Sequence, residues 1–139
     1  MSGKDHKVAA LLEGVETGPH DPHFAGYFRC FNEQKFYEAH DVLEALWLKD
    51  RHGPDGDFFK GLIQFAGGFV HLQKQRPRPA WKLFRLCATY LAKYPSPHLA
   101  LDVTNLLRLA KHWAEAAQAL GREYDLLAEQ SPPSLRLQI

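Results

Sequence analysis

The chain contains little cysteine and no long apolar run, and each shortage argues against a class of protein. Cys30 and Cys87 are the only two cysteines in 139 residues and lie far apart. This argues against a disulfide framework or a thiolate metal site and favours two reduced thiols in the core. No segment reaches the roughly 18 consecutive apolar residues of a membrane span, and residues 1–18 lack the layout of a signal peptide. We therefore expect a soluble, cytoplasmic protein with no membrane partner.

Several catalytic and structural patterns are also absent. The chain has no Gly-x-Ser-x-Gly motif, which marks many serine hydrolases, and no glycine-rich phosphate-binding loop. Gly67 and Gly68 lie inside a helical pattern, where their amides are already bonded. No segment alternates apolar and polar residues as a half-buried strand does. The sequence therefore predicts an all-α fold.

Acidic residues are missing from residues 58–101, although the whole chain has a net charge of only +1. Residues 1–57 hold eleven acidic and six basic side chains, giving −5; residues 58–101 hold seven basic ones, giving +7. The pattern favours an acidic helix packed beside a basic one, or solvated faces, and leaves an anion-binding patch as the alternative. Seven charges spread over 44 residues are too sparse to indicate nucleic-acid binding.

Apolar residues do recur at helical spacing, in segments separated by turn residues. We predict a compact array of about five antiparallel helices. Their predicted bounds are 23–31, 36–50, 58–75, 80–93 and 98–120. The break between the first two is only four residues long, which is typical of an antiparallel helical hairpin.

One domain is expected, because 139 residues can form one sizeable core and are too few for two. Residues 23–121 are predicted to form this helical domain. Residues 1–22 are expected to be an N-terminal arm or a short docked helix, since the Gly-Pro turn at residues 18–22 breaks the helical pattern of this segment. Residues 122–139 are expected to be a C-terminal extension with a mobile end, because a Ser-Pro-Pro-Ser run is typical of exposed tails.

The predicted helix 36–50 carries polar groups on an otherwise aromatic face. Residues on one arc of this helix are Phe36, Tyr37, His40, Leu43, Glu44 and Trp47. If this face points inward, the Glu44 carboxylate has to be paired, protonated or bound to a metal, because burying an unpaired carboxylate costs several kcal/mol. The face is therefore a candidate site.

The predicted helix 58–75 has a stripe of glycines opposite its apolar face. This stripe comprises Gly61, Gln64, Gly67, Gly68 and His71. Glycine costs about 1 kcal/mol relative to alanine inside a helix, so the stripe indicates a close approach by a neighbouring backbone. We expect that neighbour to be helix 36–50, which would bring Gln64 and His71 against His40 and Glu44.

Two interpretations of this four-residue cluster are open. His40, Glu44 and His71 could hold a divalent metal such as Zn²⁺, with the fourth position left for water. Candidate bases or supporting partners of such a site are Glu38, Asp41 and Gln64. Alternatively, the cluster is a dry hydrogen-bonded network that fixes how the two helices align and involves no metal or other cofactor.

The two motif-bearing helices, at residues 36–47 and 61–71, resemble domain-of-unknown-function family 309. Its members typically show an F-x-E-A-H-E-x-L-E-x-x-W helix and then a G-L-I-Q-x-A-x-x-x-x-H helix. The resemblance covers roughly residues 24–120, and Asp41 stands where the family usually has Glu. Positions that match the family motif are Glu38, His40, Glu44, Trp47, Gln64 and His71. The resemblance implies an all-helical, bacterial or archaeal protein, and the family is sometimes labelled a predicted metal-dependent hydrolase.

Two functional hypotheses follow. The favoured one is a structural or interaction module that binds a protein partner or a small molecule, or forms a homodimer. The alternative is a metal-dependent hydrolase that uses His40, Glu44 and His71, with an anionic substrate if the basic residues around Lys74 line the mouth of the site. An open, water-accessible cluster favours the hydrolase, and a closed, dry one favours the module.

Overall fold

The computed structural model describes residues 3–120 and 125–138, and these residues form seven helices and no strand. The helices are α1 (Gly3–Leu11), α2 (Pro22–Asn32), α3 (Phe36–Asp50), α4 (Gly56–Gln73), α5 (Pro77–Leu91), α6 (Val103–Leu120) and α7 (Leu126–Glu129). The prediction of an all-α fold is confirmed. No helix in the described ranges is both long and apolar enough to cross a lipid bilayer.

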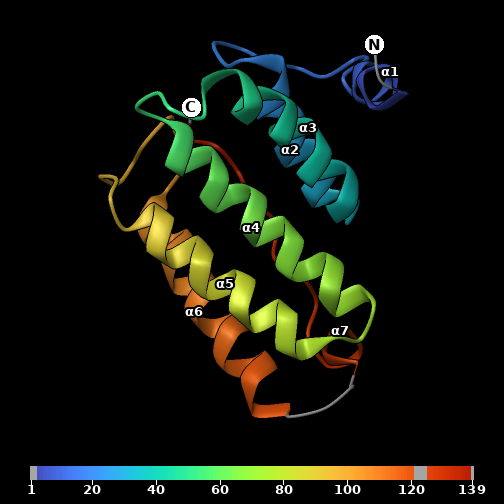
Figure 1. Cartoon of the computed structure of the whole chain (residues 1–139), viewed down its shortest axis with the longest axis vertical. Coiled ribbons are helices and arrows are strands. Elements are labelled where there is room, and N and C mark those ends of the chain that lie inside the picture. Colours follow the sequence, from blue (N-terminus) through green and yellow to red (C-terminus); the bar gives the residue numbers. More distant parts are fainter. Residues whose placement is uncertain (1–2, 121–124, 139) are drawn as a thin grey trace.

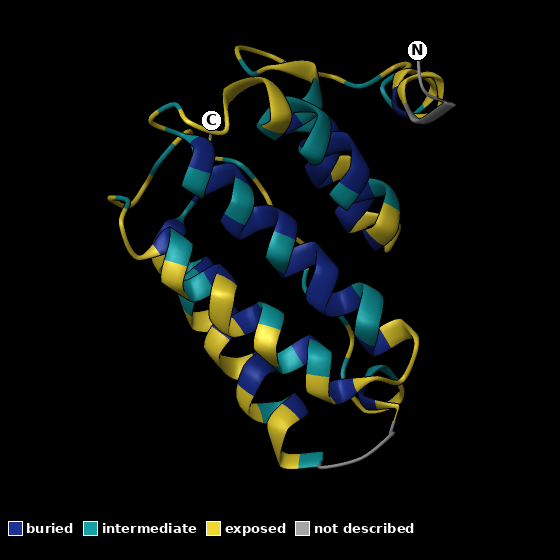
Figure 2. Cartoon of the chain, viewed as in Figure 1, coloured by how far each residue is buried: buried dark blue, intermediate teal, exposed yellow. Residues whose placement is uncertain are grey.

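The central helix is α4, which packs against α3 on one side and α5 on the other (Figure 1). Most of its residues are buried, and the buried positions of its neighbours face it (Figure 2). The core at its middle is aromatic: Phe69 contacts Phe31 of α2, Phe36 of α3, Phe84 of α5 and Trp113 of α6, with ring centroids 4.9–5.5 Å apart. One side chain thus joins five helices.

The three glycines of the stripe on α4 face α5, and the prediction that they face helix 36–50 is wrong. A Cβ added at Gly61 would lie 2.9 Å from Leu91, and one added at Gly68 would lie 2.5 Å from the Phe84 ring. Both neighbours belong to α5. The spacing of the glycines correctly indicated a close approach, but periodicity defines a face of a helix and does not say which helix covers it.

The last long helix begins at Val103, so the predicted start at residue 98 is also wrong. Leu99 and Ala100 have positive φ angles of 45° and 63°, which a right-handed helix does not allow. Asp102 caps the helix, because its Oδ1 accepts a hydrogen bond from the Asn105 amide at 2.9 Å. The Ser96 hydroxyl accepts a second bond, from the Thr104 amide at 3.1 Å.

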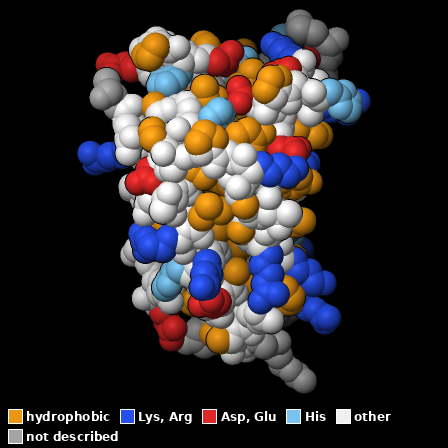
Figure 3. Space-filling view, turned by 90° about the vertical axis from the view of Figure 1, so that its left-hand side faces the viewer, with side chains coloured by type: hydrophobic (Ala, Val, Ile, Leu, Met, Phe, Trp, Pro, Cys, Tyr) orange, Lys and Arg blue, Asp and Glu red, His pale blue; other side chains and the backbone are white. Residues whose placement is uncertain are grey.

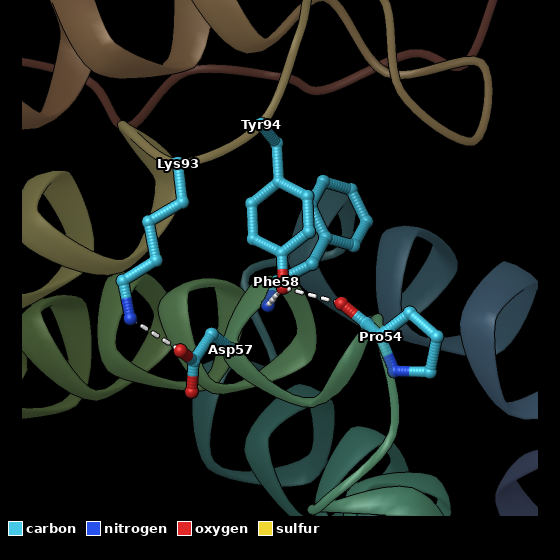
Figure 4. Close-up of polar contacts among 5 residues, drawn as sticks. All are labelled: Pro54, Asp57, Phe58, Lys93 and Tyr94. Carbon is cyan, nitrogen blue, oxygen red and sulfur yellow. Dashed lines mark hydrogen bonds and ion pairs between the residues drawn. The ribbon is translucent and has the colours of Figure 1, made fainter.

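The N-terminal end of α4 is held by Tyr94, which follows α5 (Figure 4). The Tyr94 hydroxyl accepts a hydrogen bond from the Phe58 amide at 3.0 Å and donates one to the Pro54 carbonyl at 2.8 Å. Asp55 precedes the helix but its side chain makes no capping bond; it accepts a bond from His98 Nε2 at 2.7 Å instead. A side chain distant in sequence therefore caps α4.

Described segments near both ends of the chain lie against the helical array. Val8 of α1 is buried where this helix contacts α3. The C-terminal extension, for which we expected a mobile end, passes behind α4 in Figure 1 and buries Leu135. The Asn32 side chain makes two hydrogen bonds of 2.7 Å with the Leu135 backbone, one donated and one accepted. The predicted boundary at residues 121 and 122 lies outside the described residues.

Candidate functional site

A pocket of about 220 Å³ lies between α3 and α4, and it contains three of the predicted site residues. Its lining residues are Tyr37, His40, Gln64, Gly67, Val70, His71, Lys74 and Leu83. His40, Gln64 and His71 therefore line the same pocket, together with Gly67 of the glycine stripe. Glu44 is not among the lining residues.

The polar face of α3 lies at the edge of its interface with α4 and is partly exposed to solvent. The fully buried positions of α3 that pack into the core are Phe36, Ala39, Val42 and Leu43. Tyr37 is 52% exposed, and the His40 and Glu44 side chains are 31% and 27% exposed. Because α1 and α2 also pack on α3, its most apolar arc turns toward α2 and the core, and the polar arc borders the pocket.

His40 is oriented by the carboxylate that follows it. Its Nδ1 lies 3.2 Å from Oδ1 of Asp41, whose side chain is buried. A carboxylate can only accept, so His40 Nδ1 donates this bond, and Nε2 of a neutral imidazole then carries the lone pair. Nε2 lies 3.9 Å from Oε2 of Glu44, which forms an ion pair only when His40 is protonated. His40 can therefore accept a hydrogen bond through Nε2.

Glu38, the remaining predicted carboxylate, points away from the pocket. It is half-buried on α3 and is not a lining residue. Its charge instead acts on the Cys30 thiol of α2. Burial is the main cause that raises the pKa of this thiol, and the negative charges of Glu33 and Glu38 raise it further. Glu38 thus lies toward the interface with α2.

His71 lines the pocket with a nitrogen that has no hydrogen-bond partner. Its Nδ1 is buried and is the only buried side-chain polar atom without a partner among the residues that the structure describes. Burial lowers the pKa of His71, and the nearby charges of Lys74 and Arg76 lower it further. His71 is therefore neutral at pH 7. A buried polar atom left unpaired costs about 1–3 kcal/mol. A ligand that forms a hydrogen bond with this nitrogen would remove that cost.

Two polar lining residues, Tyr37 and Lys74, were not selected as site residues from the sequence. Tyr37 stacks on His40, with ring centroids 6.2 Å apart and an angle of 22° between the planes. Lys74 is exposed just beyond the end of α4 and lines the pocket opposite the carboxylates of α3. Tyr37 was part of the predicted arc, and Lys74 was part of the predicted basic stretch, so both signals were present but weak.

The predicted metal ligands do not come together in the part of the chain that the structure describes. Over residues 3–120 and 125–138, no three His, Cys, Asp or Glu side chains come together in an arrangement that could hold a metal ion. The polar groups that line the pocket are two imidazoles, an amide, a phenol and an ammonium. Such a set donates and accepts hydrogen bonds, and its one permanent charge, on Lys74, is positive.

Comparison with known proteins finds one similarity, and it covers the segment that contains this pocket. No curated protein and no solved structure shows significant similarity to the chain. A family model, the domain of unknown function DUF309, matches residues 24–83. This range is shorter than the resemblance expected from the sequence, but it includes every residue that lines the pocket. The segment at residues 24–83 is therefore similar to the DUF309 family.

Proposed function

We propose that the DUF309-like domain of this chain is a binding module whose α3–α4 pocket receives the oxyanion end of a small molecule, a carboxylate or a phosphate. The observation that carries the proposal is the buried, unpartnered Nδ1 of His71 in a pocket edged by Lys74. An oxyanion offers acceptors for the ammonium of Lys74 and, once His71 is protonated, for both imidazole nitrogens.

The charges around the pocket support an anion on the α4 side and a neutral polar group on the α3 side. Lys74 and Arg76 both act on His71, so an anion there meets two cations. Near His40, Asp41 and Glu44 would repel a second negative charge. The His40 imidazole and the Gln64 amide can form hydrogen bonds with a hydroxyl or amide group of the same ligand. The ligand class is therefore a small polar molecule with one anionic end.

Calorimetric titration with sodium sulfate tests the proposal, since sulfate keeps both charges across the pH range used. We expect saturable binding that weakens at least about tenfold, or 1.4 kcal/mol, in Lys74→Gln and His71→Gln. The matched control is Lys49→Gln, which removes an exposed lysine of α3 outside the pocket. Equal binding by the control and by both pocket variants would overturn the proposal, as would no binding at all.

A metal-dependent hydrolase is the second candidate, and the bond between His40 and Asp41 favours it. A carboxylate that holds one imidazole nitrogen is the usual support of a metal-bound histidine, and it leaves Nε2 of His40 free to coordinate. Glu44 and His71 would have to swing toward His40 to complete the ligand set. Glu38, Asp41 and Gln64 would then be the candidate bases or supporting partners.

Metal analysis distinguishes the two candidates. Protein purified without chelator or affinity tag is expected to contain far less than one equivalent of Zn, Mn, Fe or Ni and to take up none on titration. One equivalent of bound metal that is lost in His40→Ala, with the fold retained by circular dichroism, would favour the hydrolase and contradict the binding module.

A further inference from the structure

We infer that the groove between α5 and α6 docks an acidic, amphipathic α-helix of a partner protein. The inference goes beyond the α3–α4 pocket, because the groove shares no lining residue with it. Most of the groove also lies outside residues 24–83, which match the family model. The two proposals therefore stand or fall separately.

The groove consists of two hollows that follow one another along the same pair of helices. The larger, of about 530 Å³, is lined by Phe84, Arg85, Ala88, Thr89, Ala92, Leu107, Ala110, Lys111, Ala114 and Glu115. The smaller, of about 230 Å³, is lined by Pro77, Arg78, Trp81, Ala117 and Gln118. Together they run the length of α5, whose 15 residues span about 22 Å at 1.5 Å per residue. That length fits about four turns of a docked helix.

The floor of the groove is apolar, and most of the side chains that form it are small. Alanines from both helices and the half-buried Leu107 line it, above the fully buried Phe84. Small side chains let a third helix approach closely, since helix axes pack about 8–10 Å apart. Figure 3 views the side on which α5 and α6 lie, and it shows hydrophobic side chains exposed along the middle of that face with Lys and Arg on both sides.

The rim of the groove is positive. Arg78 and Arg85 from α5 and Lys111 from α6 line it, and Glu115 is the one acidic lining residue. Lys82 and Arg108 are exposed on the same helices. The Arg85 guanidinium stacks on Trp81 at 4.6 Å and donates a hydrogen bond to Gln118, which fixes a cation where the two hollows meet. An apolar helix face flanked by Asp and Glu complements this surface in both respects.

A display library of 16-residue helices tests this inference. Each member has Leu and Ala on one face, and the flanking positions are random mixtures of Asp, Glu, Lys and Arg. We expect selection on the intact protein to enrich helices whose flanks are Asp and Glu. Binding of the enriched peptides should weaken at least tenfold in Lys111→Glu and in Thr89→Trp, which fills the groove from an exposed lining position.

The matched control is Lys49→Glu, which makes the same charge reversal at an exposed position of α3. Retained peptide binding in this control, with retained thermal unfolding of all three variants, supports the inference. It is overturned if the library yields no binder, if the enriched flanks are neutral or basic, or if the groove variants bind as well as the control. Binding of a single-stranded oligonucleotide to the same face, without acidic helices, would overturn it as well.

Discussion

Two histidine clusters lie toward opposite ends of α4, and they differ in how their hydrogen-bonding groups are used. At the N-terminal end, His98 donates to Asp55 at 2.7 Å and packs edge-on against the Phe58 ring at 4.7 Å. Toward the C-terminal end, His71 has a buried Nδ1 with no partner and lines an open pocket. Both imidazoles are partly buried. They differ in that His98 has a hydrogen-bond partner within the chain and His71 Nδ1 has none.

This difference separates a stabilising cluster from a binding one. Where every strong donor and acceptor meets a partner inside the chain, the hydrogen bonds add to the free energy of unfolding. Where a buried nitrogen has none, the fold bears a cost that a ligand can remove. We therefore expect substitutions at the His98 end to change stability, and substitutions at the His71 end to change binding with little loss of stability.

The largest effect on stability is expected where α4 packs on α5 between the two clusters. Gly68→Ala would place a Cβ 2.5 Å from the fully buried Phe84 ring, and overpacking of this kind costs about 1–3 kcal/mol. Gly67→Ala is the matched control, because its Cβ meets only the half-buried Leu83 side chain at 3.1 Å. Urea denaturation should show a loss for Gly68→Ala and a neutral or positive change for Gly67→Ala. Equal effects would mean that α4 and α5 do not pack in this way.

Removal of one hydroxyl should weaken the closed cluster next. Tyr94→Phe keeps the ring and leaves the Phe58 amide and the Pro54 carbonyl without their partner. We expect the free energy of unfolding to fall by about 1–2 kcal/mol, measured by chemical denaturation. The exposed Tyr37 provides the control, since Tyr37→Phe should change stability by less than about 0.5 kcal/mol. A Tyr94→Phe variant as stable as the parent would contradict the capping role.

The same substitution at both histidines compares the clusters directly. His98→Leu removes the bond to Asp55 and should destabilise the protein by about 1–2 kcal/mol. His71→Leu removes a polar atom that has no partner, so we expect stability to stay within about 0.5 kcal/mol of the parent or to rise. Thermal unfolding of both variants measures the difference. A larger loss for His71→Leu than for His98→Leu would reverse the assignment of the two clusters.

The smallest expected effect is on the pH dependence of stability. The pKa of His71 is lowered in the folded protein, by burial first and then by Lys74 and Arg76. As the pH falls below the ordinary histidine value of about 6.5, the unfolded chain binds a proton that the folded chain does not, so stability decreases. His71→Gln should reduce this decrease, and His52→Gln at an exposed turn should not. Identical pH profiles for the two variants would contradict a lowered pKa of His71.

The sequence predicted what depends on one helix and missed what depends on its neighbours. Aromatic spacing located the hairpin of α2 and α3, and the arc of α3 placed His40 on the side where it lines the same pocket as His71. The glycine stripe was assigned to the wrong neighbour, because α4 is buried on two sides. The cap of α4 was missed because Tyr94 reaches it from a distance of 36 residues in sequence. The start of α6 was missed because the Asp102 cap directly follows Leu99, Ala100 and Leu101, whose residue types favour a helix.

The imidazole proton signals of His71 and His98 in a nuclear magnetic resonance titration test the central claim most directly. In the absence of added anion, His71 should titrate below the ordinary histidine pKa, as its burial and its basic neighbours require. Sodium sulfate should raise the pKa of His71, because a bound anion stabilises the imidazolium, and should leave the His98 signals where they were. A His71 signal that does not respond to sulfate, or a response shared equally by His98, would contradict an open anion-binding pocket at this end of α4.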